Sequence, residues 1–346
     1  MTEVKSEIKL TEYAHGAGCG CKLEPGKLKE ILSGKTESKK IAELLAGNEG
    51  NEDAAVWKID ENNLLISTTD FFMPIVDDAF DFGCIAAANA ISDVYAMGAK
   101  PALALAILGW PSKLPLSLAT EVMNGATSIC EKAGIVIAGG HTIESEEPFF
   151  GLSVNGFVQP KHLKRNNTVK KGDLLFLTKP LGSGILSTAS KRNKLSVELT
   201  AKLIASMKKL NSVGESLGKI EGVSAMTDVT GFGLLGHLSE MIAQQSISVK
   251  IDSSKVPKMD GVDECIKSFI YPDITTSNFK WIEELVSPLN AEQLFLLCDP
   301  QTSGGLLFSA SQDTYEEVKS VLIKNDCFFE PIGIVEEYQG KVIFVN

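Results

Sequence analysis

The segment Asn89-Ala-Ile-Ser-Asp-Val-Tyr-Ala-Met-Gly-Ala-Lys-Pro101 ends a long alanine-rich, apolar stretch of the chain. The pattern predicts a helix over residues 82–97, with Asp81 as its N-cap and a glycine directly after its end. Asn89 and Asp93 are four residues apart, so they share one face of this helix, among small side chains that allow close approach. An isolated carboxylate in apolar surroundings is costly, so Asp93 needs a cation as its partner.

Two further acidic positions lie beside predicted strands. The turn from Gly47 to Asp53 is rich in acids and glycines and leads into a buried-strand pattern at residues 54–57. Asp70 directly follows a strand predicted over residues 63–69. Glycine turns beside carboxylates suit Mg²⁺, a hard cation that takes oxygen ligands and leaves room for phosphates. A solvated acidic turn is the other interpretation of residues 47–53.

Two glycine-containing turns add possible anion contacts. Gly139-Gly140-His141-Thr142 follows a short strand predicted over residues 135–138, and a turn there leaves backbone N–H groups for an anion. His141 is expected to be a contact and not a base, because a lone histidine is more often a structural residue. Asp228-Val-Thr-Gly-Phe-Gly233 leads into a helix predicted over residues 234–244, and a helix N-terminus favours phosphate.

The N-terminal stretch His15-Gly-Ala-Gly-Cys-Gly-Cys-Lys22 has a different character. Its three glycines supply no side chains for a core. Cys19 and Cys21 are two residues apart, and Lys22 can stabilise a thiolate beside it. A reactive thiol, half of a metal site and an unstructured tail are all compatible with these residues, and the part of Cys21 stays open.

Composition limits the classes of function. The chain has 346 residues, a formal net charge of -11 and a pI near 5.0, which argues against a nucleic-acid partner. An anionic ligand would therefore need metal ions. No apolar run is long enough for a membrane helix, and the first residues do not read as a secretory signal. Seven cysteines without a regular framework fit reduced thiols, so a cytoplasmic location is expected.

Strand and helix patterns alternate in mixed order, which predicts an α+β protein of two domains with mixed sheets and flanking helices. The basic, polar stretch at residues 159–172 is the predicted domain boundary. The expected units are residues 1–46, an N-terminal glycine- and cysteine-rich segment with a short helix, residues 47–160, an N-terminal α/β domain that contains the candidate Mg²⁺ and anion contacts up to residue 142, and residues 161–346, a C-terminal α/β domain.

The chain contains neither the phosphate-binding loop of P-loop enzymes nor the motif pair of protein kinases. Its separate aspartate-bearing turns together resemble the ATP-binding superfamily of aminoimidazole ribonucleotide synthetase, thiamine-monophosphate kinase and a hydrogenase maturation factor. Within it the chain is most similar to the selenophosphate synthetase family. The residues that decide this are 15–22, Phe71-Phe-Met-Pro-Ile-Val-Asp77 and Cys298-Asp-Pro-Gln-Thr-Ser-Gly-Gly-Leu-Leu307.

The resemblance implies a reaction and a set of site residues. Family members consume ATP, selenide and water and form selenophosphate, AMP and phosphate, which supplies activated selenium for selenocysteine and selenouridine in tRNA. It also implies a homodimer, a possible selenium-delivery protein as partner, and an N-terminal segment that is mobile and closes over the nucleotide. The implied catalytic residues are Cys19 and Lys22, the implied Mg²⁺ ligands are Asp53, Asp93 and Asp228, and the implied nucleotide contacts are Lys22, Gly50, Asn51, Glu52, Asp70, Asp93, Gly139, Gly140, His141 and Thr142.

Two alternatives remain open at this stage. One is another ATP-dependent kinase or synthetase of the same fold, which would not need the glycine- and cysteine-rich N-terminal segment. The other is a non-catalytic thiol or metal carrier built on His15, Cys19 and Cys21. Three candidate ligands are one fewer than a structural zinc site takes, which counts against the carrier.

Overall fold

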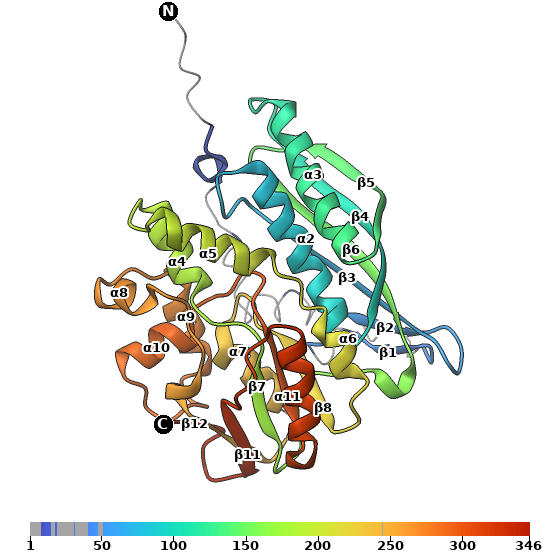
Figure 1. Cartoon of the computed structure of the whole chain (residues 1–346), viewed down its shortest axis with the longest axis vertical. Coiled ribbons are helices and arrows are strands. Elements are labelled where there is room, and N and C mark those ends of the chain that lie inside the picture. Colours follow the sequence, from blue (N-terminus) through green and yellow to red (C-terminus); the bar gives the residue numbers. More distant parts are fainter. Residues whose placement is uncertain (1–7, 15–17, 19–30, 32–40, 48–50, 244) are drawn as a thin grey trace, which may run out of the picture.

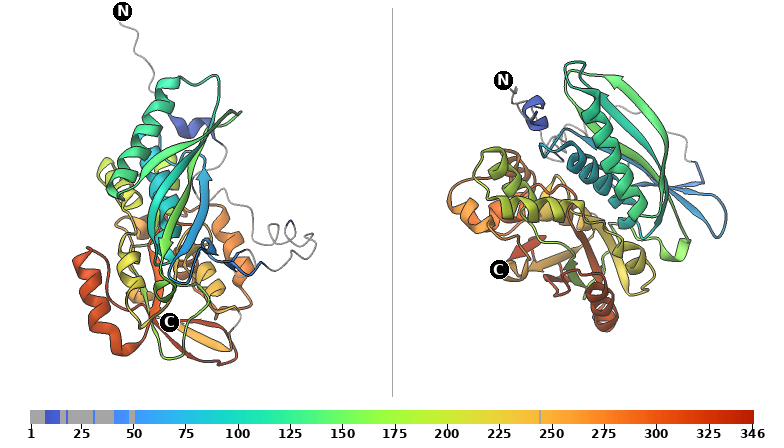
Figure 2. Two further views of the ribbon diagram at one scale, coloured as in Figure 1. Left: turned by 90° about the vertical axis from the view of Figure 1, so that its right-hand side faces the viewer. Right: turned by 45° about the horizontal axis from the view of Figure 1, so that its top comes forward.

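The computed structural model describes residues 8–14, 18, 31, 41–47, 51–243 and 245–346. Two six-stranded sheets, one from each half of the described chain, carry helices against them and lie beside each other (Figures 1 and 2). This arrangement confirms the predicted α+β fold with mixed sheets. The segment expected to be mobile lies outside the described residues, apart from Gly18.

The first sheet has the strand order β1-β2-β3-β6-β4-β5, and all its neighbours are antiparallel except the parallel pair β4 and β5. Helix α2 connects β3 to β4, and α3 provides the crossover that the parallel pair requires. Both helices pack on the same face of the sheet (Figure 1). The bounds are β1 Leu44–Ala46, β2 Ala55–Lys58, β3 Leu64–Phe72, α2 Ala79–Ala96, β4 Lys100–Trp110, α3 Leu116–Lys132, β5 Val136–Glu144 and β6 Phe149–Val158.

The second sheet has the strand order β12-β9-β11-β7-β10-β8. Its strands are β7 Leu174–Leu177, β8 Val223–Asp228, β9 Ile247–Ile251, β10 Leu306–Ala310, β11 Gly333–Glu337 and β12 Ile343–Val345. Its helices are α4 Ser183–Lys191, α5 Val197–Lys208, α6 Val213–Gly218, α7 Gly233–Ile242, α8 Val262–Lys267, α9 Ile274–Ile282, α10 Ala291–Leu297 and α11 Tyr315–Lys324. The domain limits 46/47 and 160/161 stay predictions, and strand β1 belongs to the first sheet.

Helix α2 is the element that the two halves share. It packs on β3, β4 and β6 of the first sheet and also contacts β8, α5 and α6 of the second half (Figure 1). Almost all of its residues are buried, which explains why its sequence is apolar on every side. Gly83 lies so close to the Val122 carbonyl of α3 that a Cβ would overlap it. A helix held on all sides fixes the positions of the polar groups on it.

Three local predictions were wrong. Asp70 does not follow its strand but lies within β3, which continues to Phe72. The N-cap of α2 is Asp78, whose side chain accepts a hydrogen bond from the Asp81 backbone N–H at 2.7 Å, so the helix begins one turn earlier than expected. The expected turn at residues 139–142 is part of strand β5. Gly140 is needed there because a Cβ would overlap the backbone of Ala106 on β4, so the glycine reflects close strand packing and not a turn.

None of the helices in the described parts of the chain is long and apolar enough to cross a membrane.

Candidate functional site

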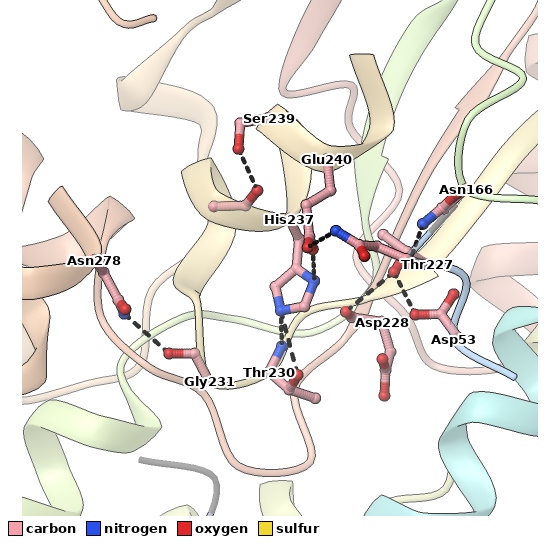
Figure 3. Close-up of polar contacts among 12 residues, drawn as sticks. Asp53, Asn166, Thr227, Asp228, Thr230, Gly231, His237, Ser239, Glu240 and Asn278 are labelled. Carbon is pink, nitrogen blue, oxygen red and sulfur yellow. Dashed lines mark hydrogen bonds and ion pairs between the residues drawn. The ribbon is translucent and has the colours of Figure 1, made fainter. Parts of the chain in front are cut away.

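A cluster of acids forms where the two halves of the chain meet. Asp53 comes from the turn before β2, Asp93 from α2 and Asp228 from the last residue of β8. The Thr227 hydroxyl donates a hydrogen bond of 2.7 Å to Asp53 Oδ1 (Figure 3). Asp53 Oδ2 is enclosed and has no hydrogen-bond partner among the described residues. Three separate stretches that the sequence marked as acidic are therefore brought together by the fold.

The electrostatics of this cluster favour a cation. Burial raises the pKa of Asp53 well above its usual value, and the negative charges of Asp228 and Asp93 raise it further. A carboxylate that is enclosed and faces like charges is stabilised when a positive ion shares the site. The orphaned Oδ2 of Asp53 is an oxygen donor of the kind that Mg²⁺ prefers. The residues present therefore fit a divalent cation.

Nowhere in the described chain do three or more His, Cys, Asp or Glu side chains form a group that could hold a metal ion. Mg²⁺ usually takes one or two carboxylates from a protein and completes its octahedron with water and substrate phosphates. Asp53, Asp93 and Asp228 as Mg²⁺ ligands remain a prediction.

Strand β3 and helix α2 present polar side chains to each other in two matched pairs. Thr68 Oγ1 donates to Asp93 Oδ2 at 2.5 Å, and Asn89 Nδ2 donates to Asp70 Oδ2 at 2.7 Å. Residues two apart on a strand share a face, and so do residues four apart on a helix. The expected common face of Asn89 and Asp93 is confirmed, and Asp70 lies against it. Sequence reasoning missed Thr68, although its spacing from Asp70 is the available signal.

Two predicted nucleotide contacts hold the halves of the chain together in this structure. The enclosed Glu52 side chain forms an ion pair of 2.6 Å with the partly exposed Arg165 Nε and accepts a hydrogen bond from the Asn166 backbone N–H at 3.1 Å. Asn51 donates to Glu240 Oε1 at 3.1 Å, and its carbonyl accepts from Asn166 Nδ2 at 2.6 Å. These partners lie more than a hundred residues away, so no local sequence pattern indicates them.

The turn after Asp228 is fixed by His237 on α7 (Figure 3). The Thr230 backbone N–H donates to His237 Nε2 at 3.0 Å, and His237 Nδ1 faces Glu240 Oε2 at 3.5 Å. Because Nε2 accepts a hydrogen bond, the ring proton lies on Nδ1 toward Glu240. His237 is thus a structural residue that shapes the turn beside Asp228.

The loop between α10 and β10, residues 298–305, is buried and covers the start of α4. Asp299 Oδ2 accepts hydrogen bonds from the Gly184 N–H at 3.1 Å and from Gln301 Nε2 at 2.8 Å. Gln301 Oε1 accepts from the N–H groups of Gly182 and Ser183, each at 3.1 Å. Protein side chains therefore use these N–H groups, and Gly182-Ser183-Gly184 is a packing turn.

Asp299→Asn is expected to make stability less dependent on pH. Burial raises the pKa of Asp299 to about 8, against about 3.9 in an unfolded chain. Its contribution to stability is therefore full below pH ~3.9 and is lost as the pH rises through 8, by up to ~1.4 kcal/mol per pH unit. The asparagine oxygen keeps both acceptor contacts without the charge. Urea unfolding between pH 5 and 8 should show the wild type losing free energy of unfolding relative to the variant, and parallel curves would contradict this.

The same loop also contacts the first half of the chain. The Ser303 backbone N–H donates to Asn89 Oδ1 at 2.8 Å, and Asn211 Nδ2 donates to the Gly304 carbonyl at 2.8 Å. Lys179 Nζ donates to the Ser303 carbonyl at 2.8 Å. Burial lowers the pKa of Lys179 to about 7, and the negative charge of Asp228 opposes that shift. Sequence reasoning missed Lys179, because lysine is rarely buried even when, as here, an apolar strand precedes it.

The remaining predicted residues fall into two groups. Gly139, Gly140, His141 and Thr142 lie on the exposed edge strand β5, three strands from β3 in the order β3-β6-β4-β5. At ~4.8 Å per strand this is about 14 Å across the sheet from Asp70. Cys19, Lys22 and Gly50 lie outside the described residues. The five cysteines that are described are unpaired, and the four that lie in apolar helices or the buried loop are enclosed, as expected for packing residues.

Comparisons with known proteins identify the domains and the family of the chain. The family models "AIR synthase related protein, N-terminal domain" and "AIR synthase related protein, C-terminal domain" match residues 51–158 and 170–346. The chain is 48% identical over 342 residues to selenide, water dikinase of Photorhabdus laumondii, covering 98% of this chain and 99% of that protein. It is 50% identical over 337 residues to selenide, water dikinase of Escherichia coli K12, covering 97% of each chain.

Solved structures of lower identity share the fold. Thiamine-monophosphate kinase from Stenotrophomonas maltophilia K279a is 20% identical with a TM-score of 0.65, over 89% of this chain and 92% of that chain. Hydrogenase maturation protein HypE in complex with ATP is 17% identical with a TM-score of 0.61, over 97% of this chain and 91% of that chain. Taken with the near full-length identity to the curated relatives, the fold and the matched domains place this chain in the selenide, water dikinase family of AIR synthase related proteins.

Proposed function

We propose that this protein catalyses the ATP-dependent formation of selenophosphate from selenide and water, with release of AMP and phosphate. Near 50% identity over almost the whole chain to selenide, water dikinases supports this activity. The observation that carries it within the chain is the acid cluster at the seam between the halves, with Asp53 enclosed and facing Asp228 and Asp93.

Asp53, Asp93 and Asp228 are proposed to hold Mg²⁺. A bound divalent cation would neutralise phosphate charge and orient the transferred group, which is the main requirement of phosphoryl transfer. The chain's own residues fix the carboxylates. Thr227 orients Asp53, Thr68 orients Asp93, and Asn89 orients Asp70, which is proposed to contact the nucleotide. Without a cation, a chain of charge -11 would repel a polyphosphate.

Cys19 is proposed as the catalytic thiol and Lys22 as the cation that contacts nucleotide phosphate. A soft thiolate suits selenium, and a lysine ammonium suits phosphate oxygens as a point charge. Gly50, Asn51 and Glu52 are also proposed to contact the nucleotide, because they directly precede Asp53 in the sequence.

A homodimer is proposed through the open face of the first sheet. The face opposite α2 and α3 exposes apolar side chains that a monomer would leave in water. They are Trp57, Phe71, Leu103, Leu105, Val136, Ile143 and Phe157. A second copy of the same sheet buries such a face symmetrically. Because Gly139 to Thr142 lie far from Asp70 in their own chain, we propose that they contact nucleotide held by the partner copy.

Two further proposals concern the surroundings of the enzyme. A cytoplasmic location fits the unpaired cysteines of the described chain. Selenide is air-sensitive, so a protein that delivers selenium directly is a proposed partner.

The activity is tested by phosphorus NMR of ATP turnover under anaerobic conditions, with and without selenide. Selenophosphate and AMP are expected from the wild type, and ADP as the final product would point to another kinase of the same fold. Cys19→Ser is expected to lose selenophosphate formation at least 100-fold. Cys327→Ser is the matched control and should behave as the wild type. Full selenide-dependent AMP formation by Cys19→Ser would contradict the role of the thiol.

A further inference from the structure

Gly18, the residue directly before Cys19, is fixed between the two halves of the chain. Its backbone N–H donates to the Met73 carbonyl at 3.2 Å, and the residue is buried. Its φ of +51° is a left-handed conformation that favours glycine. A Cβ at this position would overlap Thr302 Oγ1 and Ile75 Cδ1. The backbone is held where no other residue fits without displacement of its neighbours.

A second anchor lies seven residues earlier. Leu10 is fully buried in the hydrophobic core, and the Thr11 backbone N–H and hydroxyl donate to Asp77 Oδ1 at 3.3 and 2.5 Å. Asp77 and Met73 both lie between β3 and α2, within the segment of residues 71–77. One short segment therefore binds the N-terminal part of the chain at two points, Gly18 through Met73 and Thr11 through Asp77.

The loop that contains Thr302 is hydrogen-bonded to the two elements that carry Asp93 and Asp228. The Thr302 backbone N–H donates to Ser183 Oγ at 3.0 Å, and Thr302 is almost completely buried. Its neighbour Ser303 donates to Asn89, which in turn donates to Asp70. On the other side, the Gln301 N–H donates to the Thr230 carbonyl at 2.9 Å, in the turn after Asp228. Thr302 is thereby held in fixed relation to both proposed ligand-bearing elements.

We propose that Ile75 and Thr302 form a seat for Gly18, that Asp77 secures the chain upstream through Thr11, and that these three are positioning residues for the selenide-dependent step. They act by holding the backbone at Gly18, directly before the proposed catalytic residue in the sequence. This inference rests on the proposed catalytic role of Cys19. It assigns a function to the 71–77 segment and to Thr302, neither of which contributes a reacting group.

The test inserts a methyl group into the seat. Gly18→Ala is expected to lower kcat for selenide-dependent AMP formation at least tenfold, with KM for ATP changed less than twofold, because the proposed nucleotide contacts are untouched. Adding Ile75→Val and Thr302→Ala to Gly18→Ala removes the overlapping atoms. This triple variant should have a kcat at least threefold higher than that of Gly18→Ala alone. Gly172→Ala is the matched control, because Gly172 has a positive φ of 89° but open space around its Cβ position. It should leave kcat unchanged.

A second readout does not depend on turnover. The alkylation rate of Cys19 by iodoacetamide, measured by peptide mass spectrometry with Cys327 as internal reference, should rise at least threefold in Gly18→Ala. Asp77→Ala should raise it similarly, and Asp77→Asn should raise it less because its side-chain oxygen still accepts from Thr11. If the wild type makes no selenophosphate but the variants still show faster alkylation of Cys19, the proposed function is overturned while the contacts that hold Gly18 are supported. Unchanged alkylation, unchanged kcat or an equal rise in KM for ATP would overturn the positioning role.

Discussion

Asp53→Asn is expected to abolish ATP turnover and to stabilise the metal-free protein. Loss of one carboxylate from the proposed Mg²⁺ site should lower AMP formation at least ~100-fold. The same change removes a charge that is enclosed and repelled by Asp228 and Asp93. We expect the free energy of unfolding without Mg²⁺ to rise by about 1–3 kcal/mol. Turnover assays and denaturant unfolding with and without Mg²⁺ and a non-hydrolysable ATP analogue measure both effects.

The pH dependence of this stability follows from the raised pKa of Asp53. A carboxyl whose pKa is higher in the folded state contributes fully below the unfolded value of ~3.9 and loses that contribution as the pH rises. The advantage of the asparagine variant should therefore grow with pH. Asp313→Asn, an exposed acid outside the cluster, is the control. A variant that keeps its turnover, or that is less stable than the wild type without Mg²⁺ at pH 8, would contradict the proposed cation site.

Phe157→Lys should convert the proposed dimer to a monomer and reduce ATP turnover at least tenfold. Phe157 is 48% exposed on β6, on the sheet face opposite α2 and α3. A lysine there would bring two like charges to a symmetric interface. Turnover should fall because the partner would no longer supply residues 139–142. Light scattering after size-exclusion chromatography measures the mass of the particle.

Val197→Lys is the matched control for that substitution. Val197 is 89% exposed at the start of α5, in the other half of the chain, so a lysine there should change neither mass nor turnover. A wild type that is monomeric at micromolar concentration would refute the dimer. A fully active Phe157→Lys monomer would refute the shared nucleotide contact.

Local spacing in the sequence correctly predicted the elements that carry the acids. The turn at Asp228 leads into helix α7, and Asn89 and Asp93 share a face of α2, as expected. These features depend on the periods of strands and helices, which act over a few residues. The sequence also identified the acidic turns themselves. Identity of residue type at matched spacing was enough for the family resemblance, which the comparisons confirmed.

Contacts between distant segments decided the rest. Glycines 139 and 140 indicated a turn, but a strand pairing with Ala106 is what excludes a side chain from position 140. The acidic turn around Glu52 was visible in the sequence, but its ion pair with Arg165, more than a hundred residues away, was not. A glycine such as Gly18 is typical of a flexible backbone, but the side chains of Ile75 and Thr302 lie so close to Gly18 that a Cβ would overlap them. Sequence patterns record which groups are present and which local periods they follow. Steric exclusion and charge pairing between the two halves of the chain depend on which distant segments lie next to each other, and only the tertiary structure decides that.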